Sequence, residues 1–193
     1  MYQASRNFTS NGSGQHLFVG KTNSGSARRA ILAFDVDGGI PAGATVSTVA
    51  LTLNMSRTVA GVQEIELLRL LSDWGEGTSD AGGNEGTGVA AVSGDATWVH
   101  TNFDSEEWDT PGGDYSSPAA ASQLVDGTGQ YTWASTEKLV ADVQSWLDDP
   151  STNFGWLLMG NEAENQTSKR FDSRDNGNEA NQPTLTVVFT SPE

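Results

Sequence analysis

The chain has 193 residues and carries 25 Asp and Glu against 10 Lys and Arg, which gives a formal net charge of −15 at pH 7. Such a negative field repels phosphate backbones and anionic lipid surfaces, which excludes nucleic acid and membranes as expected partners. The sequence has no cysteine, so disulfides, thiol catalysis and cysteine-ligated metals are excluded as well.

The length suits one well-buried core, and no stretch has the composition of a linker between two cores. We therefore expect a single domain over residues 1–193, with a polar and flexible N-terminal stretch at 1–14. No apolar run approaches the roughly 20 residues of a membrane-spanning helix, and no signal peptide is visible. The first residues have the look of a start placed on a module cut from a longer precursor.

Alternation of apolar and polar side chains with period two predicts most of the strands. The pattern is clearest where Val49, Leu51, Leu53 and Met55 alternate with polar or small neighbours, as in a half-buried strand. In chain order, the segments expected to be strands are 30–36, 48–56, 65–71, 97–100, 130–133, 156–159 and 184–190. Short strands separated by turns predict an all-β fold, an antiparallel two-sheet β-sandwich of jelly-roll rather than immunoglobulin type.

One segment, at about 136–148, predicts an amphipathic helix packed against the sandwich. Its apolar residues recur at helical spacing and are Leu139, Val140, Val143, Trp146 and Leu147. Ser135 or Thr136 can cap the start of this helix, and Asp149 followed by Pro150 ends it.

The segment from 73 to about 130 is rich in Gly, Asp, Ser and Thr, and a stretch this long between strands usually forms functional loops. It contains Trp74, Trp98 and Trp108 near its turns. An exposed indole in such a loop can stack on the C–H face of a sugar ring. A buried indole would instead anchor the loop to the core, and the sequence leaves both interpretations open.

Half of the scarce positive charges fall in two short segments. They are Arg28 and Arg29 in the first, and Lys169, Arg170 and Arg174 in the second. If the second segment is extended, Phe171 points inward and Arg170, Asp172 and Arg174 form one outward row. This row either forms an ion ladder with Asp35 and Asp172, or faces a saccharide, whose carboxylates and vicinal hydroxyls match guanidinium forks.

Catalytic motifs are not evident. The chain has two histidines, His16 and His100, and no G-x-S-x-G element. The acidic residues at 104–109 lie in loop sequence, and the glycine-rich run at 86–91 lacks the flanking strand and helix of a dinucleotide site. We therefore expect a protein without enzymatic activity.

The metal ligands cannot be assigned from the sequence. Zinc is disfavoured by two histidines and no cysteine, whereas a structural Ca²⁺ ion is compatible with scattered loop carboxylates. The candidate calcium ligands are Asp35, Asp37, Asp73, Asp80, Asp95 and Asp114.

Several motifs, in order along the chain, resemble the disaggregatase-related (DNRLRE) domain family, which overlaps the family 96 carbohydrate-binding modules. They lie at 17–23, 28–36, 40–46, 73–79, 94–98, 108–114, 140–147 and 169–174. The resemblance implies a β-sandwich module of large bacterial or archaeal surface and secreted proteins, some relatives of which bind alginate or similar acidic glycans. Members of the family usually begin with an acidic residue before a short strand. Here ASRNF at 4–8 takes that place and has no acidic residue, so a calcium site built on that segment would lack this ligand.

These observations predict a non-catalytic carbohydrate-binding module, secreted or on the cell surface, that binds an extracellular polysaccharide, as part of a larger multidomain protein. The alternative is a structural or adhesive module, such as a matrix spacer or a self-assembling filament subunit without a small ligand. The predicted carbohydrate-binding residues are Arg28, Arg29, Lys169, Arg170, Arg174, Trp74, Trp98 and Trp108.

Overall fold

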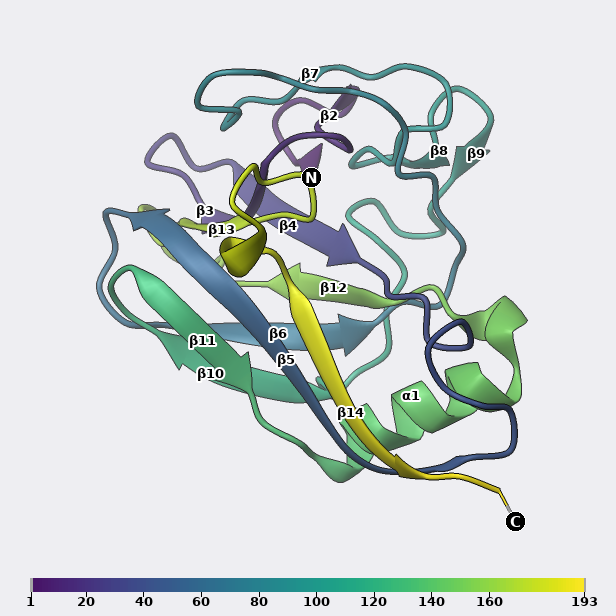
Figure 1. Ribbon diagram of the computed structural model, residues 1–193. Coiled ribbons are helices and arrows are strands. Elements are labelled where there is room, and N and C mark those ends of the chain that lie inside the picture. The colour runs from purple at the N-terminus through teal and green to yellow at the C-terminus, as the bar shows by residue number, and fades with distance from the viewer. Residues whose placement is uncertain (1, 193) are drawn as a thin grey trace.

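Ten of the strands form one continuous antiparallel sheet that folds into two facing layers, as the computed structural model shows for residues 2–192 (Figure 1). The strands are β1 (Tyr2–Gln3), β2 (Thr9–Ser10), β3 (His16–Lys21), β4 (Ala27–Leu32), β5 (Thr45–Thr58), β6 (Gln63–Arg69), β7 (Val89–Ala90), β8 (His100–Asn102), β9 (Glu106–Glu107), β10 (Ala121–Val125), β11 (Gly129–Trp133), β12 (Trp156–Met159), β13 (Lys169–Asp172) and β14 (Thr184–Thr190). The prediction of an all-β sandwich with one helix is confirmed.

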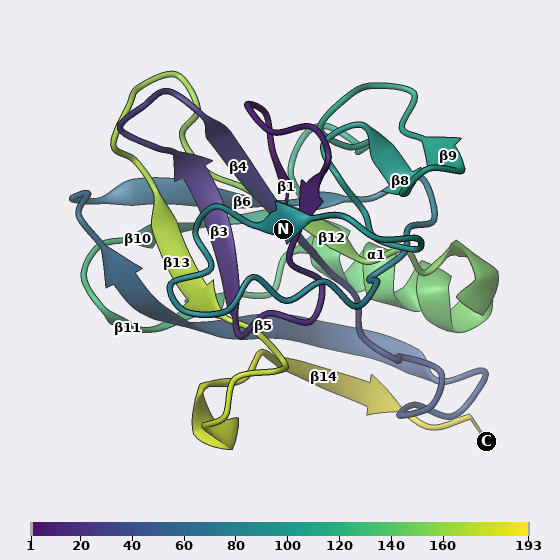
Figure 2. The ribbon, with the colours of Figure 1, turned by 90° about the horizontal axis from the view of Figure 1, so that it is seen from above.

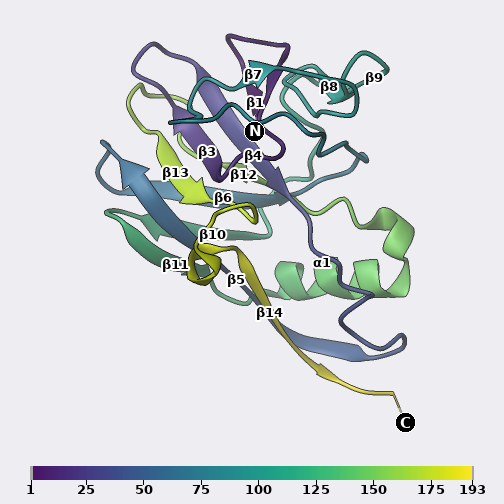
Figure 3. The same cartoon turned by 45° about the horizontal axis from the view of Figure 1, so that its top comes forward.

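The strand order is that of a jelly roll. One layer has the order β3-β13-β5-β11 and the other β4-β12-β6-β10, so most consecutive strands lie in opposite layers. The short pairing of β3 with β4 joins the layers at one corner, and the turn from β10 to β11 links them at the opposite edge. β14 pairs with the first part of β5, whereas β13 pairs with its last part (Figure 3).

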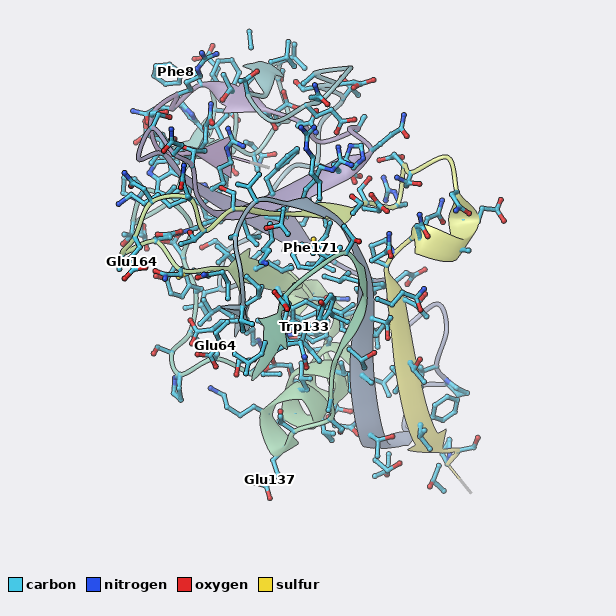
Figure 4. The ribbon with its side chains drawn as sticks, turned by 90° about the vertical axis from the view of Figure 1, so that its left-hand side faces the viewer. Phe8, Glu64, Trp133, Glu137, Glu164 and Phe171 are labelled. Carbon is cyan, nitrogen blue, oxygen red and sulfur yellow. The ribbon has the colours of Figure 1, made fainter. Side chains whose placement is uncertain are left out.

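The core lies between the two layers and follows from the alternation in β5. Leu51, Leu53 and Met55 are fully buried, while their neighbours along the strand are half-buried. Trp133 of β11 and Phe171 of β13 point into the same space, with their ring centroids 5.9 Å apart (Figure 4). Glutamates such as Glu137 and Glu164 point outward.

The single helix, α1 (Glu137–Asp148), covers one end of the sandwich and confirms the predicted helix. The hydroxyl of Thr136 accepts from the Leu139 amide, which makes Thr136 the N-cap. The buried face of the helix packs into the core, where Trp146 meets Trp156 with ring centroids 4.5 Å apart. Gln144 also accepts from the Val46 amide, so the helix satisfies a donor at the edge of β5. Two short 3-10 helices, Pro150–Thr152 and Glu179–Asn181, lie in later loops.

The long segment between β6 and β10 folds back over the outer face of the β4-β12-β6 layer, and Figure 2 shows part of it crossing above β3 and β4. Ile31, Leu68 and Leu157 point to this side, and with Ala96 and Trp108 they form a second buried cluster. The loop tryptophans therefore lie against the sheet, as the anchoring interpretation predicts.

Three sequence predictions need adjustment. The strand expected at 97–100 is found only from His100 onward, and the one expected at 30–36 ends at Leu32. The N-terminal stretch, predicted to be flexible over 1–14, pairs through β1 with β4 and through β2 with β7 over its described residues. Gln3 and Ser10 are buried there, while Met1 lies outside the described residues.

Candidate functional site

Lys169 lies in the interior, contrary to its prediction as a ligand-binding residue. It is 0% exposed, and its ammonium donates to the carbonyl oxygens of Ala60, Gly61 and Asp126. Burial lowers the pKa of Lys169, and the negative charge of Asp126 partly opposes that shift. The alternation that points Phe171 inward does the same to the residue two positions earlier, so Lys169 cannot touch a surface ligand.

Arg29 and Trp98 connect the long loop to the outer face of β4. The Arg29 guanidinium binds Glu162 through two nitrogens, at 2.8 and 2.9 Å, and donates to the Gly112 carbonyl at 2.8 Å. It also stacks 4.8 Å from the ring centroid of Trp98 and 5.6 Å from that of Tyr115. A bidentate and stacked arginine of this kind fixes the long loop to the sheet.

Trp108 is likewise buried in the interior rather than exposed at the surface. It is 4% exposed, and its indole N–H donates to the Thr97 carbonyl at 3.0 Å. The prediction that it stacks on a sugar ring is therefore wrong, because its ring faces are covered by the second cluster.

Four arginines gather around Phe18 on the outer face of the β3-β13-β5 layer, and we call this surface the arginine face. In the strand register, Arg170 of β13 lies between Phe18 of β3 and Arg57 of β5. Arg28 of β4 stacks over Phe18 at 5.5 Å, and the charge of Arg6 acts on it. The members of the face are Arg6, Arg28, Arg57 and Arg170.

The charges of the arginine face are left without salt bridges. Within residues 2–192, the Arg and Lys side chains that form salt bridges to carboxylates are those of Arg29, Arg69 and Arg174. The partners of the arginine face are neutral: Arg28 donates to Gln3, Arg57 to Asn84 and Arg170 to Ser56.

The electrostatics of the face follow from burial and from like charges. Burial is the main cause that lowers the pKa of Arg28, and Arg6 adds to it. Burial also lowers the pKa of Arg170; Asp172 and Glu85 oppose the shift, and Arg57 reinforces it. Like charges placed directly opposite on neighbouring strands destabilise a sheet, so this arrangement has a cost that a bound anion would relieve.

The two carboxylates whose charges act on Arg170, those of Glu85 and Asp172, accept hydrogen bonds from other residues. Glu85 accepts from Asn11 and from the amides of Gln15 and His16. His16 lies between two acids, with Nδ1 3.2 Å from Glu85 and Nε2 3.5 Å from Asp172. These interactions hold the loop that contains Glu85 against the face.

The predicted outward row forms only in part. Phe171 points inward as predicted, and Asp172 lies on the outer side, where Asn54 donates to it at 2.6 Å. Arg174 lies beyond the end of β13, and Asp35 accepts from the Gly38 amide of its own turn. No ion ladder with Asp35 forms, because Asp35 is turned to this local bond.

Trp74 and Arg174 do come together, at a cavity of about 330 Å³ that none of the four arginines lines. The cavity lies between the end of β4, the loop after β6 and the segment after β13. Of the eight predicted carbohydrate-binding residues, these two line it.

The six candidate calcium ligands are dispersed, and several serve local turns. Asp73 accepts from the Trp74 amide, Asp80 from the Gly82 amide, and Asp114 from the amides of two residues in its own loop. Within residues 2–192, no cluster of three or more acidic or histidine side chains is arranged to hold a metal ion. No helix in this part of the chain is long and apolar enough to span a membrane.

Sequence reasoning missed Arg6 and Arg57 because the two residues lie far from the charge-rich segments along the chain. Because the chain has only 10 Lys and Arg, each arginine is a candidate for binding an anion, and this was a usable signal. The strand register that places Arg57 opposite Arg170 includes a bulge, which no periodicity predicts.

No family model matches the chain, and no curated protein matches it significantly. The resemblance to the DNRLRE family therefore stays a prediction.

Proposed function

We propose that this chain is a non-catalytic module that binds an acidic polysaccharide through the arginine face, in a secreted or cell-surface protein. One observation carries the proposal. In a chain of net charge −15, four arginines gather without salt bridges on one face, two of them half-buried. Uronic acid carboxylates, repeated along a glycan chain, would supply direct salt-bridge partners in the bidentate geometry that guanidinium prefers.

The shape of the face suits a polymer better than a single small anion. Arg57 and Arg6 are exposed, while Phe18 is covered by the loop that carries Glu85 and Gly86. A ligand would therefore lie along the surface and meet the arginines in succession. Affinity per site would be modest and would rise through avidity in a multidomain parent.

Affinity electrophoresis against a polyuronate such as alginate and against neutral glucans, with and without Ca²⁺, tests the proposal. We expect the polyuronate to retard the wild type and Arg57→Gln to bind about 2–10-fold more weakly, as for the loss of one exposed hydrogen bond that contributes about 0.5–1.5 kcal/mol. Lys138→Gln, which also removes one exposed positive charge, is the matched control and should bind like the wild type. No retardation by any acidic polysaccharide, or equal loss in both variants, would overturn the proposal.

A second candidate, a structural module that assembles through strand addition, is favoured by β14. Within the described residues this strand pairs only with β5, which leaves its other edge open (Figure 3). It has the uncharged sequence TLTVVFT, and its Val188 is 53% exposed. Natural edge strands usually carry charges or proline that prevent such pairing. Light scattering and electron microscopy over a range of protein concentrations would reveal ordered polymers if this function applies, and a strict monomer would exclude it.

A further inference from the structure

The cavity at Trp74 is separate from the arginine face, and its lining has a different chemistry. It is built where β4 ends, and Ile31 and Phe34 supply apolar walls. None of the four members of the arginine face lines it. Its volume of about 330 Å³ is near the lower end of the range for ligand pockets, about 300–1,000 Å³. It therefore suits a small ligand, or one end or a short stretch of a chain.

The Trp74 indole is held in a fixed orientation at this cavity. Its N–H donates to the Phe154 carbonyl at 2.8 Å, and one side of the residue packs on the second buried cluster. The side chain is half-buried, so part of the ring remains accessible beside Phe34. A fixed aromatic surface loses little conformational entropy when a flat apolar face stacks on it.

An ion pair between the two loops marks the polar side of the cavity. Arg174 Nη2 lies 2.6 Å from Glu76 Oε2, and Arg174 Nε lies 4.0 Å from Asp175 Oδ1. The side chains of all three are at least 36% exposed. The lining thus carries two acids and one base, and the base is already bonded to one of the acids.

The polar groups deeper in the cavity are satisfied within the protein. Ser10 donates to the Ala96 carbonyl, Asn11 is bonded to Glu85 and to the Ala81 amide, and Ser173 donates to the Gly14 carbonyl. The carboxylates of Glu76 and Asp175 accept hydrogen bonds only, so they seek donors on a ligand. Hydroxyl groups provide such donors, whereas a ligand carboxylate would meet two like charges and would have to displace Glu76 from Arg174.

We infer that this cavity is a second binding site and that it takes a neutral sugar residue. The apolar face of the ring lies on Trp74 and Phe34, and its hydroxyls donate to Glu76 and Asp175. The inference does not rest on the arginine face, because the two sites share no residue, and one favours an anionic ligand while the other favours a neutral one. A chain bearing both sites would bind a polysaccharide of mixed composition, or two different glycans.

Isothermal titration with neutral oligosaccharides of glucose, mannose, galactose and xylose tests the inference. The C6-oxidised counterpart of each hexose oligomer, matched in size but charged, is titrated into the Arg57→Gln/Arg170→Gln variant, in which binding at the arginine face is weakened. At least one neutral oligosaccharide should bind, and the C6-oxidised form of a hexose oligomer that binds should bind the Arg57→Gln/Arg170→Gln variant at least tenfold more weakly than the neutral form does. Ala33→Phe places a ring in the cavity from an exposed position and should weaken neutral binding at least tenfold. Ala134→Phe, at an exposed position outside the cavity, is the matched control and should leave binding unchanged.

Glu76→Gln provides a second variant that adds no bulk. It should weaken neutral binding about 3–10-fold and narrow the preference over the oxidised form, because one repelling charge is gone. Arg57→Gln should leave neutral binding unchanged. The inference is overturned if no neutral oligosaccharide binds, if the oxidised forms bind the Arg57→Gln/Arg170→Gln variant as tightly, or if Ala33→Phe and Glu76→Gln have no effect. Binding of polyuronate that Arg57→Gln weakens would support the proposed function in any of these cases.

Discussion

Lys169 offers a sharp test of how the fold is held together. Its carbonyl partners belong to two turns: Ala60 and Gly61 lie between β5 and β6, and Asp126 lies between β10 and β11. One ammonium therefore joins two turns, each of which passes from one layer of the sandwich to the other. Lys169→Met keeps a side chain of similar length and removes all three donated hydrogen bonds.

The size of the effect follows from two opposing contributions. A hydrogen bond from a charged donor contributes about 1.5–3 kcal/mol, so three contribute about 5–9 kcal/mol. Rehydration of the ammonium in the unfolded chain offsets several kcal/mol of this gain. We therefore expect Lys169→Met to lower the free energy of unfolding by about 2–4 kcal/mol.

Urea unfolding followed by tryptophan fluorescence measures this change, with Lys21→Met as the control. Lys21 is half-buried, and its ammonium makes no hydrogen bond or salt bridge within the described part of the chain. Its substitution should change the free energy of unfolding by less than about 0.5 kcal/mol. A loss below about 1 kcal/mol at Lys169, or an equal loss at Lys21, would refute the account of Lys169 as a bridge between turns.

Three further changes test other parts of the structure. Burial raises the pKa of Asp142, and a hydrogen bond from Trp156 opposes this shift. Asp142 therefore holds its proton more tightly in the native protein than in the unfolded chain. Its contribution to stability falls as pH rises through the native pKa. Asp142→Asn should therefore gain in thermal stability relative to wild type between pH 4 and pH 7, and a constant difference would contradict this. Gly155 has φ of 73°, and a Cβ there would lie 2.1 Å from a backbone oxygen, so Gly155→Ala should cost about 2–4 kcal/mol by urea unfolding. Gly82→Ala, with similar φ but open space, should cost only about 1 kcal/mol, and equal costs would refute the clash. Thr136→Ala removes the N-cap of α1 and should cost about 1 kcal/mol by the same assay, while a neutral result would show that the cap adds nothing.

The sequence predicts much of the fold because its strands alternate cleanly. In β5 and β14, apolar residues at every second position mark the buried face, and the strand at 184–190 begins and ends as predicted. The helix at Glu137–Asp148 follows from one apolar stripe and a capping threonine. These features depend on local patterns, which a single sequence displays directly.

The candidate site was harder to predict because it depends on register and on side-chain direction. Arg28 and Arg29 are adjacent in sequence, yet the first points toward Phe18 and the second toward Trp98 on the other side of the sheet. Because successive side chains of a strand point to opposite faces, Lys169 points into the core and Arg170 points outward. The partner of Arg170 is Arg57, brought opposite it by a pairing between strands more than 100 residues apart.

The tryptophans illustrate a limit of composition as a guide. Trp98 and Trp108 lie in glycine-rich sequence, where exposure is a reasonable expectation, but the loop folds over Ile31 and Leu157 and takes its indoles with it. Trp74 alone of the three reaches the cavity, because its loop turns along the end of β4. No sequence pattern distinguishes these outcomes, since each depends on how the long segment packs.

The most direct test of the central claim is titration of the chain with a defined oligouronate, comparing wild type with the Arg57→Gln/Arg170→Gln variant at low and moderate salt. The account predicts that the wild type binds, that binding weakens as salt rises, and that the double variant binds at least tenfold more weakly while remaining as stable. Binding that is equally strong in the double variant, or an oligouronate that does not bind at low salt, would contradict the claim that the arginine face is the ligand site.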